Sequence, residues 1–579
     1  MIVPTNLIQE EVNHLILSTL EKIHKSGPTS GEVLETISYL KEFYPQQLSI
    51  YESTLMYELG LFYKTTPPNS MRELVYHTYK NIIEDSTGKV YSPIQYSEFK
   101  NISEHSVFSF SAPTSSGKSH VFLDILKESA YDIVIVLPSR ALIAEYLQKL
   151  KTSVPEDVLV LQFVDNINIA NTRRRIFVIT PERAEELFDK YTNLNIQLIL
   201  FDEAQISEDN VRGLRFDALV RRINQKMPDT KIVFAHPFIQ NPEAQIERNQ
   251  LTGRDNKYMS YNQQNVGKIF LYRDASNQYY YFSPYTDERA VKAEDIIYQT
   301  LVHRNGTVLI YVAKTHLYSA QFINEYKSYL ELCPEIENPK ALQMIAELRD
   351  YLGGTYVGED RSLILELMKH GVVIHHGSMP LKARFLIEKF VNAKFAKICF
   401  ATSTLIQGIN MPFDVVWVDH FDKQISKNKQ ISKNRKILDF KNLIGRAGRT
   451  SGDKNCFDYG YVVINENRRA KVKEFIHANS ILLSDSLINA PVETINEDIR
   501  DIVEAVQTDT FDSHLQITES QKVRLMERDV YTNIIELLDI LFTNERFLTG
   551  NAYHKLPQNV KKKVKSHFQD IFVKHLRRD

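Results

Sequence analysis

A glycine, a lysine and a serine stand together in residues 112–119 at the spacing of a phosphate-binding loop. The apolar run Phe108–Ser111 leads into Ala-Pro-Thr-Ser-Ser-Gly-Lys-Ser, with alanine where such loops usually begin with glycine, and an apolar helical pattern follows. In a loop of this kind, backbone N–H groups and the positive end of the next helix face phosphate oxygens. Lys118 can reach the β- and γ-phosphates, and the Ser119 hydroxyl can bind magnesium. The predicted nucleotide-binding residues here are Ala112, Thr114, Ser115, Ser116, Gly117, Lys118 and Ser119.

Acidic residues follow a second apolar run in the same part of the chain. Leu198–Phe201 ends in Asp-Glu-Ala-Gln at 202–205, and ligands of an open α/β sheet bind at the carboxyl ends of its strands. We expect Asp202 to hold magnesium through water and Glu203 to orient and deprotonate an attacking water, with Gln205 in the same catalytic group. The alternative is an ordinary helix N-cap, a common use of aspartate. Together with the phosphate loop, the acids indicate ATP hydrolysis.

Strands and helices must alternate to position such residues, and the apolar runs have that order. Strands that alternate with helical stretches indicate parallel sheets built from βαβ units. Two series of short apolar runs are separated by helical patterns, which predicts two α/β blocks. The runs are 106–110, 133–137, 176–179, 198–201 and 231–234 in the first series, and 307–312, 372–374, 398–400, 415–418 and 461–464 in the second.

Length and composition are those of a multidomain globular protein. The chain has 579 residues, 43% of them hydrophobic and 25% charged, and its net charge is −2; a single core rarely exceeds about 250–300 residues. We expect a helical N-terminal accessory domain over 1–85, α/β domains over 86–255 and 256–470, and a helical C-terminal region over 471–579. No apolar run approaches the ~20 residues that span a bilayer, the N-terminus lacks a signal-peptide pattern, and the three cysteines lie far apart. These features favour a cytoplasmic protein.

Several further motifs resemble those of superfamily 2 helicases of the DExH type, in the superkiller-like branch. The resemblance covers roughly residues 90–465 and extends to bacterial defence helicases of the Hachiman type. It implies two tandem RecA-like domains that hold ATP and magnesium between them. In family order, the motifs are Pro93-Ile94-Gln95, 138–142, Thr180-Pro181-Glu182, 234–237, 373–377, 401–412 and 442–449.

The resemblance also implies roles for individual residues. Gln95 would read the adenine edge, Gly408 and Asn410 would contact the nucleotide, and the nucleic-acid backbone would meet Arg140, Thr180, Pro181 and Thr404. Arg446 and Arg449 would be arginine fingers, because guanidinium groups stabilise charge on the γ-phosphate. His236 stands where the family has a Ser-Ala-Thr motif, and Asn442 replaces the usual glutamine. Taken singly, the arginines could form a basic turn, and His375-His376 a buried polar pair.

An immediate repeat lies between the last two motifs. Lys-Gln-Ile-Ser-Lys-Asn occurs at 423–428 and again at 429–434. Superkiller-like helicases carry a strand-separating β-hairpin in this interval, so the repeat is interpreted as that hairpin or, equally, as a solvated basic loop. The residues expected to meet nucleic acid here are Lys423, Lys427, Lys429 and Lys433.

The resulting prediction is an ATP-dependent helicase or translocase that moves along single-stranded or tailed duplex nucleic acid, with the family's usual 3′-to-5′ direction. One alternative is a translocase that hydrolyses ATP without separating strands. Another is a nucleic-acid-sensing ATPase that gates a protein effector, such as a nuclease in phage defence, docked on the N-terminal helices. A phosphate-loop kinase is disfavoured because it leaves the second block's motifs without a purpose.

Overall fold

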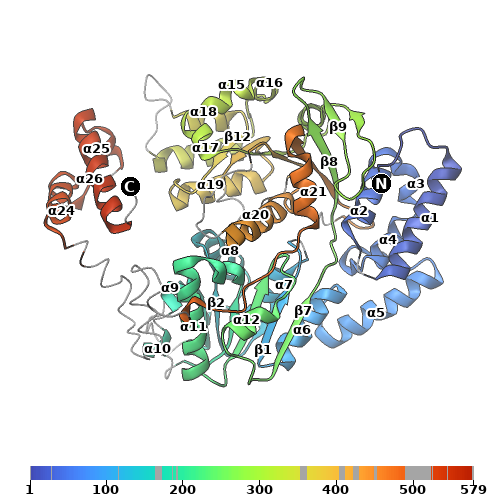
Figure 1. The fold of residues 1–579 in the computed structure, drawn as a ribbon, viewed down its shortest axis with the longest axis horizontal. Coiled ribbons are helices and arrows are strands. Elements are labelled where there is room, and N and C mark those ends of the chain that lie inside the picture. Colours follow the sequence, from blue (N-terminus) through green and yellow to red (C-terminus); the bar gives the residue numbers. More distant parts are fainter. Residues whose placement is uncertain are drawn as a thin grey trace.

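The computed structural model contains two α/β lobes, an N-terminal helical region and a C-terminal group of helices (Figure 1). It describes residues 2–27, 29–114, 116–162, 172–184, 187–190, 194–352, 362–402, 411, 413–420, 429–448, 453–489, 523, 526–543, 546–548 and 550–576. The two lobes confirm the predicted pair of RecA-like domains. Within these ranges, no helix is both long and apolar enough to cross a bilayer.

The first lobe is built on a seven-stranded sheet in the order β3-β4-β2-β5-β6-β1-β7. All its strand pairs are parallel. Its central strands read as continuous apolar runs because both faces are buried, each under its own core cluster. The strands are β1 (Val107–Ser111), β2 (Asp132–Val136), β3 (Val158–Leu161), β4 (Arg174–Ile179), β5 (Ile196–Phe201), β6 (Lys231–His236) and β7 (Asn256–Ser260).

Helices of the first lobe connect these strands. The last strand, β7, extends the sheet beyond the boundary predicted at residue 255, because it pairs with β1. The helices are α6 (Pro93–Glu104), α7 (Lys118–Glu128), α8 (Arg140–Lys151), α9 (Pro181–Ala184), α10 (Leu187–Lys190), α11 (Asn210–Lys226) and α12 (Glu243–Arg248).

The second lobe is built on an eight-stranded sheet in the order β10-β9-β8-β15-β14-β11-β13-β12. Five strands at one side continue the parallel pattern, and β8 adds a sixth before the sheet ends in the antiparallel strands β9 and β10. The strands are β8 (Gly267–Arg273), β9 (Tyr279–Tyr281), β10 (Val291–Ala293), β11 (Val308–Tyr311), β12 (Val372–His375), β13 (Ile398–Ala401), β14 (Val415–Val418) and β15 (Tyr459–Asn465).

One helix of the second lobe corrects an expectation. The interval around 423–434 was interpreted as a hairpin or loop, but its second copy of the repeat begins the helix α20, and residues 421–428 lie outside the described ranges. Strong helix formers and the buried residues further along α20 favour this outcome. The helices are α13 (Ile296–Tyr298), α14 (Lys314–Tyr318), α15 (Gln321–Glu325), α16 (Lys327–Leu330), α17 (Pro339–Leu352), α18 (Leu363–Lys369), α19 (Leu381–Asn392), α20 (Lys429–Ile444) and α21 (Arg469–His477).

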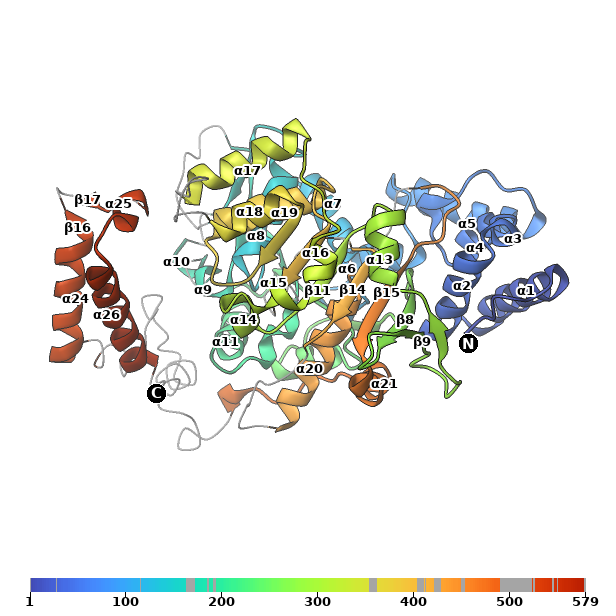
Figure 2. The same cartoon turned by 90° about the horizontal axis from the view of Figure 1, so that it is seen from above.

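The N-terminal helices pack on the second lobe, beside β8 (Figures 1 and 2). Ile16 and Leu34 share one core cluster with Trp417 of β14. The ammonium of Lys64 is fully buried and lies 2.6 Å from Asp458. The same region also reaches the first lobe, because Tyr57, Phe62 and Ile83 belong to a core cluster that includes β1 and α7. Its helices are α1 (Gln9–Ser26), α2 (Gly31–Phe43), α3 (Pro45–Ser49), α4 (Glu52–Glu58) and α5 (Met71–Thr87).

Beyond α21 the chain returns to the first lobe as a strap, residues 479–489. Ser480 accepts a hydrogen bond from the Gln240 backbone at 3.0 Å. The Ser486 hydroxyl donates to the buried carboxylate of Asp217 at 2.6 Å, and Arg248 holds the same carboxylate at 2.7 Å. The strap therefore joins the end of the second lobe to the far side of the first.

The C-terminal elements, drawn in red in Figure 1, form a separate helical group. They are α24 (Arg528–Leu541), β16 (Phe542–Thr543), β17 (Arg546–Phe547), α25 (Gly550–His554) and α26 (Gln558–Leu576).

Candidate nucleotide site

The phosphate loop connects β1 to α7 and is tightly held. Gly117 has φ +95°, a left-handed conformation that favours glycine. The buried ammonium of Lys118 donates to the carbonyl of Ala112 at 2.5 Å and to that of His236 at 3.3 Å. Burial lowers the pKa of Lys118, while the carboxylates of Glu203 and Asp202 oppose the shift. Ser115 lies outside the described residues.

The acids after β5 face this loop. Asp202 is buried, and burial followed by the charge of Glu203 raises its pKa to about 6. Glu203 adopts φ 55°, which costs on the order of 1–3 kcal/mol in a residue that is not glycine. Gln205 donates from Nε2 to the Glu203 carboxylate at 2.5 Å. The strained turn and this hydrogen bond together fix the direction of the Glu203 side chain.

Tyr146 of α8 belongs to the site although no sequence motif predicts it. Its buried hydroxyl donates to Oδ2 of Asp202 at 3.0 Å and also interacts with Ser119. The two predicted magnesium ligands, Ser119 and Asp202, are therefore brought to the same hydroxyl. Hydroxyl and carboxylate oxygens suit Mg²⁺, which takes one or two carboxylates together with substrate phosphates. No cluster of three or more His, Cys, Asp or Glu side chains suited to a metal occurs among the described residues.

His236 stands at the end of β6, directly beside the phosphate loop. Burial and the neighbouring Lys118 lower its pKa to about 3, so the imidazole is neutral. Its carbonyl accepts from the Ala112 backbone at 3.1 Å, and Ile239 donates to the Ser111 hydroxyl at 2.7 Å. This segment continues to Gln240, which binds the strap. The phosphate loop and the strap are thus neighbours through 236–241.

Gln95 begins α6, where it forms a capping box with Ser92. Its Oε1 accepts from the Ser92 backbone at 2.9 Å, and its Nε2 lies so near Gly117 that a Cβ there would be 2.3 Å away. A cavity of about 90 Å³ adjoins this helix end. It is lined by Ser92, Pro93 and Ile94, by aromatic side chains of the N-terminal region, and by Gln263 and Asn265 between the lobes.

The second lobe reaches the same loop through the end of α20. Gly445 lies against Thr114: a Cβ on Gly445 would be 2.2 Å from the Thr114 hydroxyl. Both residues line a cavity of about 210 Å³ together with Lys441 and Phe238. Arg446 is buried next to Gly445. Arg449 and the segment 403–410, which contains Thr404, Gly408 and Asn410, lie outside the described residues.

An ion pair also crosses between the lobes. Arg435 of α20 lies 2.6 Å from the Asp209 carboxylate, which follows the acidic motif. Asp439, one turn further along α20, has a pKa raised to about 6 by burial, with the charges of Asp209 and Glu203 adding to the shift. The acidic motif therefore faces α20 directly.

The predicted nucleic-acid contacts are only partly described. Arg140 begins α8, and Thr180 and Pro181 stand at the end of β4, where the Thr180 carbonyl accepts from Ala184 at 3.0 Å. Lys433 pairs with Glu474 of α21 at 2.8 Å. The side chain of Lys429 and all of Lys423 and Lys427 lie outside the described part.

Comparison with known proteins agrees with this geometry. The family described as DEAD/DEAH box helicase matches residues 92–235. The matched residues contain Gln95, the phosphate loop, Asp202 and Glu203.

Three relatives extend the similarity. The ATP-dependent DNA helicase Hel308 of Thermoplasma volcanium is 23% identical over 381 residues, 63% of this chain and 51% of the relative. The Hachiman protein HamB of Bacillus cereus is 35% identical over 152 residues, which are 26% of this chain and 12% of the relative. The human U5 small nuclear ribonucleoprotein 200 kDa helicase is 23% identical over 384 residues, which are 59% of this chain and 17% of the relative. The chain thus spans about half or less of these relatives, and the predicted likeness to superkiller-like superfamily 2 helicases is confirmed.

Proposed function

We propose that the chain is an ATP-dependent nucleic-acid helicase or translocase with its ATP site between the two lobes. The contact between Thr114 and Gly445 carries the proposal, because it places the helicase domain's phosphate loop against the second lobe. Lys118 would bind the phosphates, Ser119 and Asp202 magnesium, and Glu203 the attacking water. Arg446 and Arg449 would stabilise charge on the γ-phosphate.

ATP would drive movement through its different affinity for two arrangements of the lobes. Contacts with both lobes favour the closed arrangement, and hydrolysis removes some of those contacts. A single strand would cross both lobes, held through its phosphates near Arg140 and Thr180. We include in this proposal that the protein moves along the strand in the 3′-to-5′ direction, which is usual in the family.

The test is ATP turnover measured with no nucleic acid, single-stranded DNA, single-stranded RNA and tailed duplexes, followed by strand separation on duplexes with 3′ or 5′ tails. We expect single strands to stimulate turnover and 3′-tailed duplexes to be separated. Turnover that no nucleic acid stimulates would contradict the motor. Stimulation without strand separation would identify a translocase.

A second candidate function is an ATPase that gates a protein effector in phage defence. The similarity to the Hachiman protein favours it. So does an exposed apolar stripe on α5, a helix whose buried Ile83 packs in a first-lobe core cluster. The members of the stripe are Met71, Leu74, Val75, Tyr79 and Ile82. The test is co-purification with the product of a neighbouring gene. A Val75→Asp variant that keeps the partner would argue against docking on this stripe.

A further inference from the structure

The C-terminal helices α24 and α26 lie side by side, and one face of α26 is committed to that contact (Figure 2). Glu536 of α24 pairs with Lys563 at 2.7 Å and with His567 at 3.0 Å. His567 also meets the Asn533 amide oxygen at 2.7 Å, and Val564 is buried. These contacts fix the rotation of α26 about its axis.

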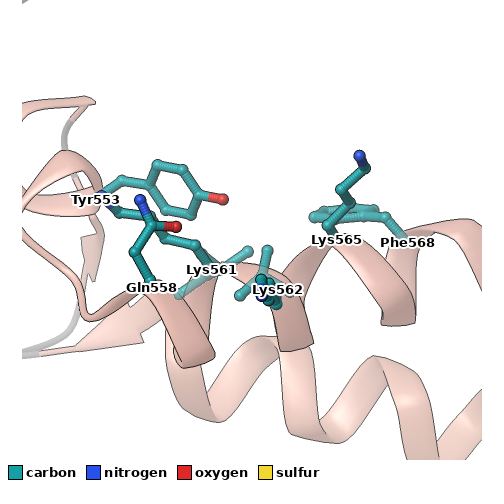
Figure 3. Close-up of a pocket in the computed structure, with 8 residues that line it drawn as sticks. Tyr553, Gln558, Lys561, Lys562, Lys565 and Phe568 are labelled. Atoms are coloured by element: carbon teal, nitrogen blue, oxygen red, sulfur yellow. The ribbon is translucent and has the colours of Figure 1, made fainter.

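A neighbouring face of α26 forms a groove with α25 and with the end of α24, and Val564 and Leu541 also line it. The groove encloses a cavity of about 590 Å³. Figure 3 shows the side chains that line it. Lys561, Lys565 and Phe568 are spaced by four and three residues, so they follow one face of the helix. Lys561 also donates to the His554 carbonyl at 2.5 Å, which holds it beside Tyr553 of α25. Phe568 is 47% exposed.

Charge is concentrated in this part of the chain. Residues 550–576 contain six lysines and one aspartate, a net charge of +5, while the whole chain has −2. Lys563 is neutralised by Glu536 on the other face. The groove therefore combines a local cationic surface with two aromatic rings and two aliphatic side chains; its lining residues are Leu541, Tyr553, Gln558, Lys561, Lys562, Val564, Lys565 and Phe568.

We propose that this basic-aromatic groove binds single-stranded nucleic acid at a site separate from the two lobes. Lysines would meet phosphates, and Tyr553 and Phe568 would stack on bases. Proteins that hold single strands without reading sequence combine a positive groove with aromatic stacking platforms in this way. A membrane surface fits less well, because interfacial helices bury a continuous apolar face, whereas Lys561, Lys562 and Lys565 stand among the apolar residues of this groove. The groove would keep hold of a strand that the motor is moving.

The test uses the full chain without nucleotide, so that it does not depend on ATP turnover. Binding of fluorescent oligo(dT) and oligo(U) is measured between about 50 and 200 mM salt. The charge variant replaces Lys561, Lys562 and Lys565 with glutamine, and an arginine triple at the same positions keeps the charge. The matched control replaces three exposed lysines elsewhere, Lys257, Lys292 and Lys340.

We expect the glutamine triple to lose at least about tenfold in affinity and to flatten the slope of log affinity against log salt by about 2, since three phosphate contacts are lost. The arginine triple and the control should bind as the native chain does. A Tyr553→Ala, Phe568→Ala variant should lose about thirtyfold or more in affinity, at about 1–3 kcal/mol for each stacked base, with the slope unchanged because stacking does not release counterions.

Unchanged binding by the glutamine triple would overturn the proposal. So would an equal loss in the control, which would mean that only overall charge matters. Vesicles of phosphatidylcholine and phosphatidylserine provide the remaining arm: loss of vesicle binding with oligonucleotide binding intact would make the groove a membrane contact. Nucleic-acid-independent ATP turnover should be the same in all variants, so a failed motor proposal and a failed groove proposal are distinguishable.

Discussion

Thr114 and Gly445 touch across the two lobes, and the position of Gly445 has no room for a side chain. A Cβ there would lie 2.2 Å from the Thr114 hydroxyl, well inside contact distance. The close approach exists only in the arrangement in which phosphate loop and α20 meet. It therefore offers a direct test of whether turnover requires that arrangement.

Gly445→Ala should lower kcat by about tenfold or more, because the added methyl group keeps the lobes apart, while ATP binding to the first lobe changes little. Adding Thr114→Ala should restore part of the rate by removing the clashing hydroxyl. Steady-state turnover and nucleotide binding by fluorescence measure the two effects. A double variant no faster than Gly445→Ala alone would mean that the methyl group acts elsewhere.

Lys118→Ala should abolish ATP hydrolysis without unfolding the protein, because the ammonium is the loop's cation for the phosphates. Phosphate release measures turnover, and circular dichroism checks the fold. Lys127→Ala, on the same helix, is the matched control and should keep a native rate. Robust ATP turnover by the Lys118→Ala variant would contradict the assignment of residues 112–119 as the ATP site.

The arginine finger gives a larger expected effect than binding residues do. Arg449→Ala and Arg446→Ala should each reduce ATP turnover. The variant that removes the arginine finger should reduce it by a factor of about 10³–10⁵. ATP affinity should change far less, since the finger acts on charge that develops in the transition state. Native rates in both variants would mean that the lobes do not share one site.

Tyr146→Phe isolates one hydroxyl beside the predicted magnesium ligands. The change removes the 3.0 Å hydrogen bond to Asp202 and the interaction with Ser119 while keeping the ring. Loss of such an orienting group costs about 10–100-fold in metal affinity or activity. We expect a higher magnesium requirement for turnover, with kcat recovering at saturating magnesium. An unchanged magnesium titration would show that Tyr146 is only a packing residue.

Glu98 makes stability depend on pH. Burial raises its pKa to about 8, and neither carboxyl oxygen has a hydrogen-bond partner among the described residues. The native state keeps the proton that the unfolded state loses near pH 4.5, so this contribution to stability falls from about pH 4.5 to pH 8. Glu98→Gln should flatten that fall in urea unfolding measured at pH 6 and pH 8. Glu104→Gln, at an exposed glutamate, should leave the fall in stability with pH unchanged.

The parallel strands could be predicted because burial on both faces leaves a local trace. Runs such as Ile133–Leu137 and Leu198–Phe201 are apolar at every position, and the phosphate loop and acids follow such strands directly. Tyr146 could not be found in this way: it meets Asp202 only through the packing of α8, and its helical pattern is that of any buried tyrosine. The same holds for Arg435 and Asp209, which are 226 residues apart. The helix in the second copy of the repeat, 429–434, could not be predicted because the buried residues of α20 lie mostly beyond it.

The strap has a mechanical consequence. The chain crosses to or from the first lobe three times: between α5 and α6, through residues 261–266, and through residues 479–489, where Ser480 and Ser486 are bonded to the first lobe. A body attached at one point can swing in any direction, whereas each further attachment removes directions in which it can move. Opening and closing over ATP is thereby confined to fewer directions than a single linker would allow, and the N-terminal helices, which contact both lobes, add to this restriction.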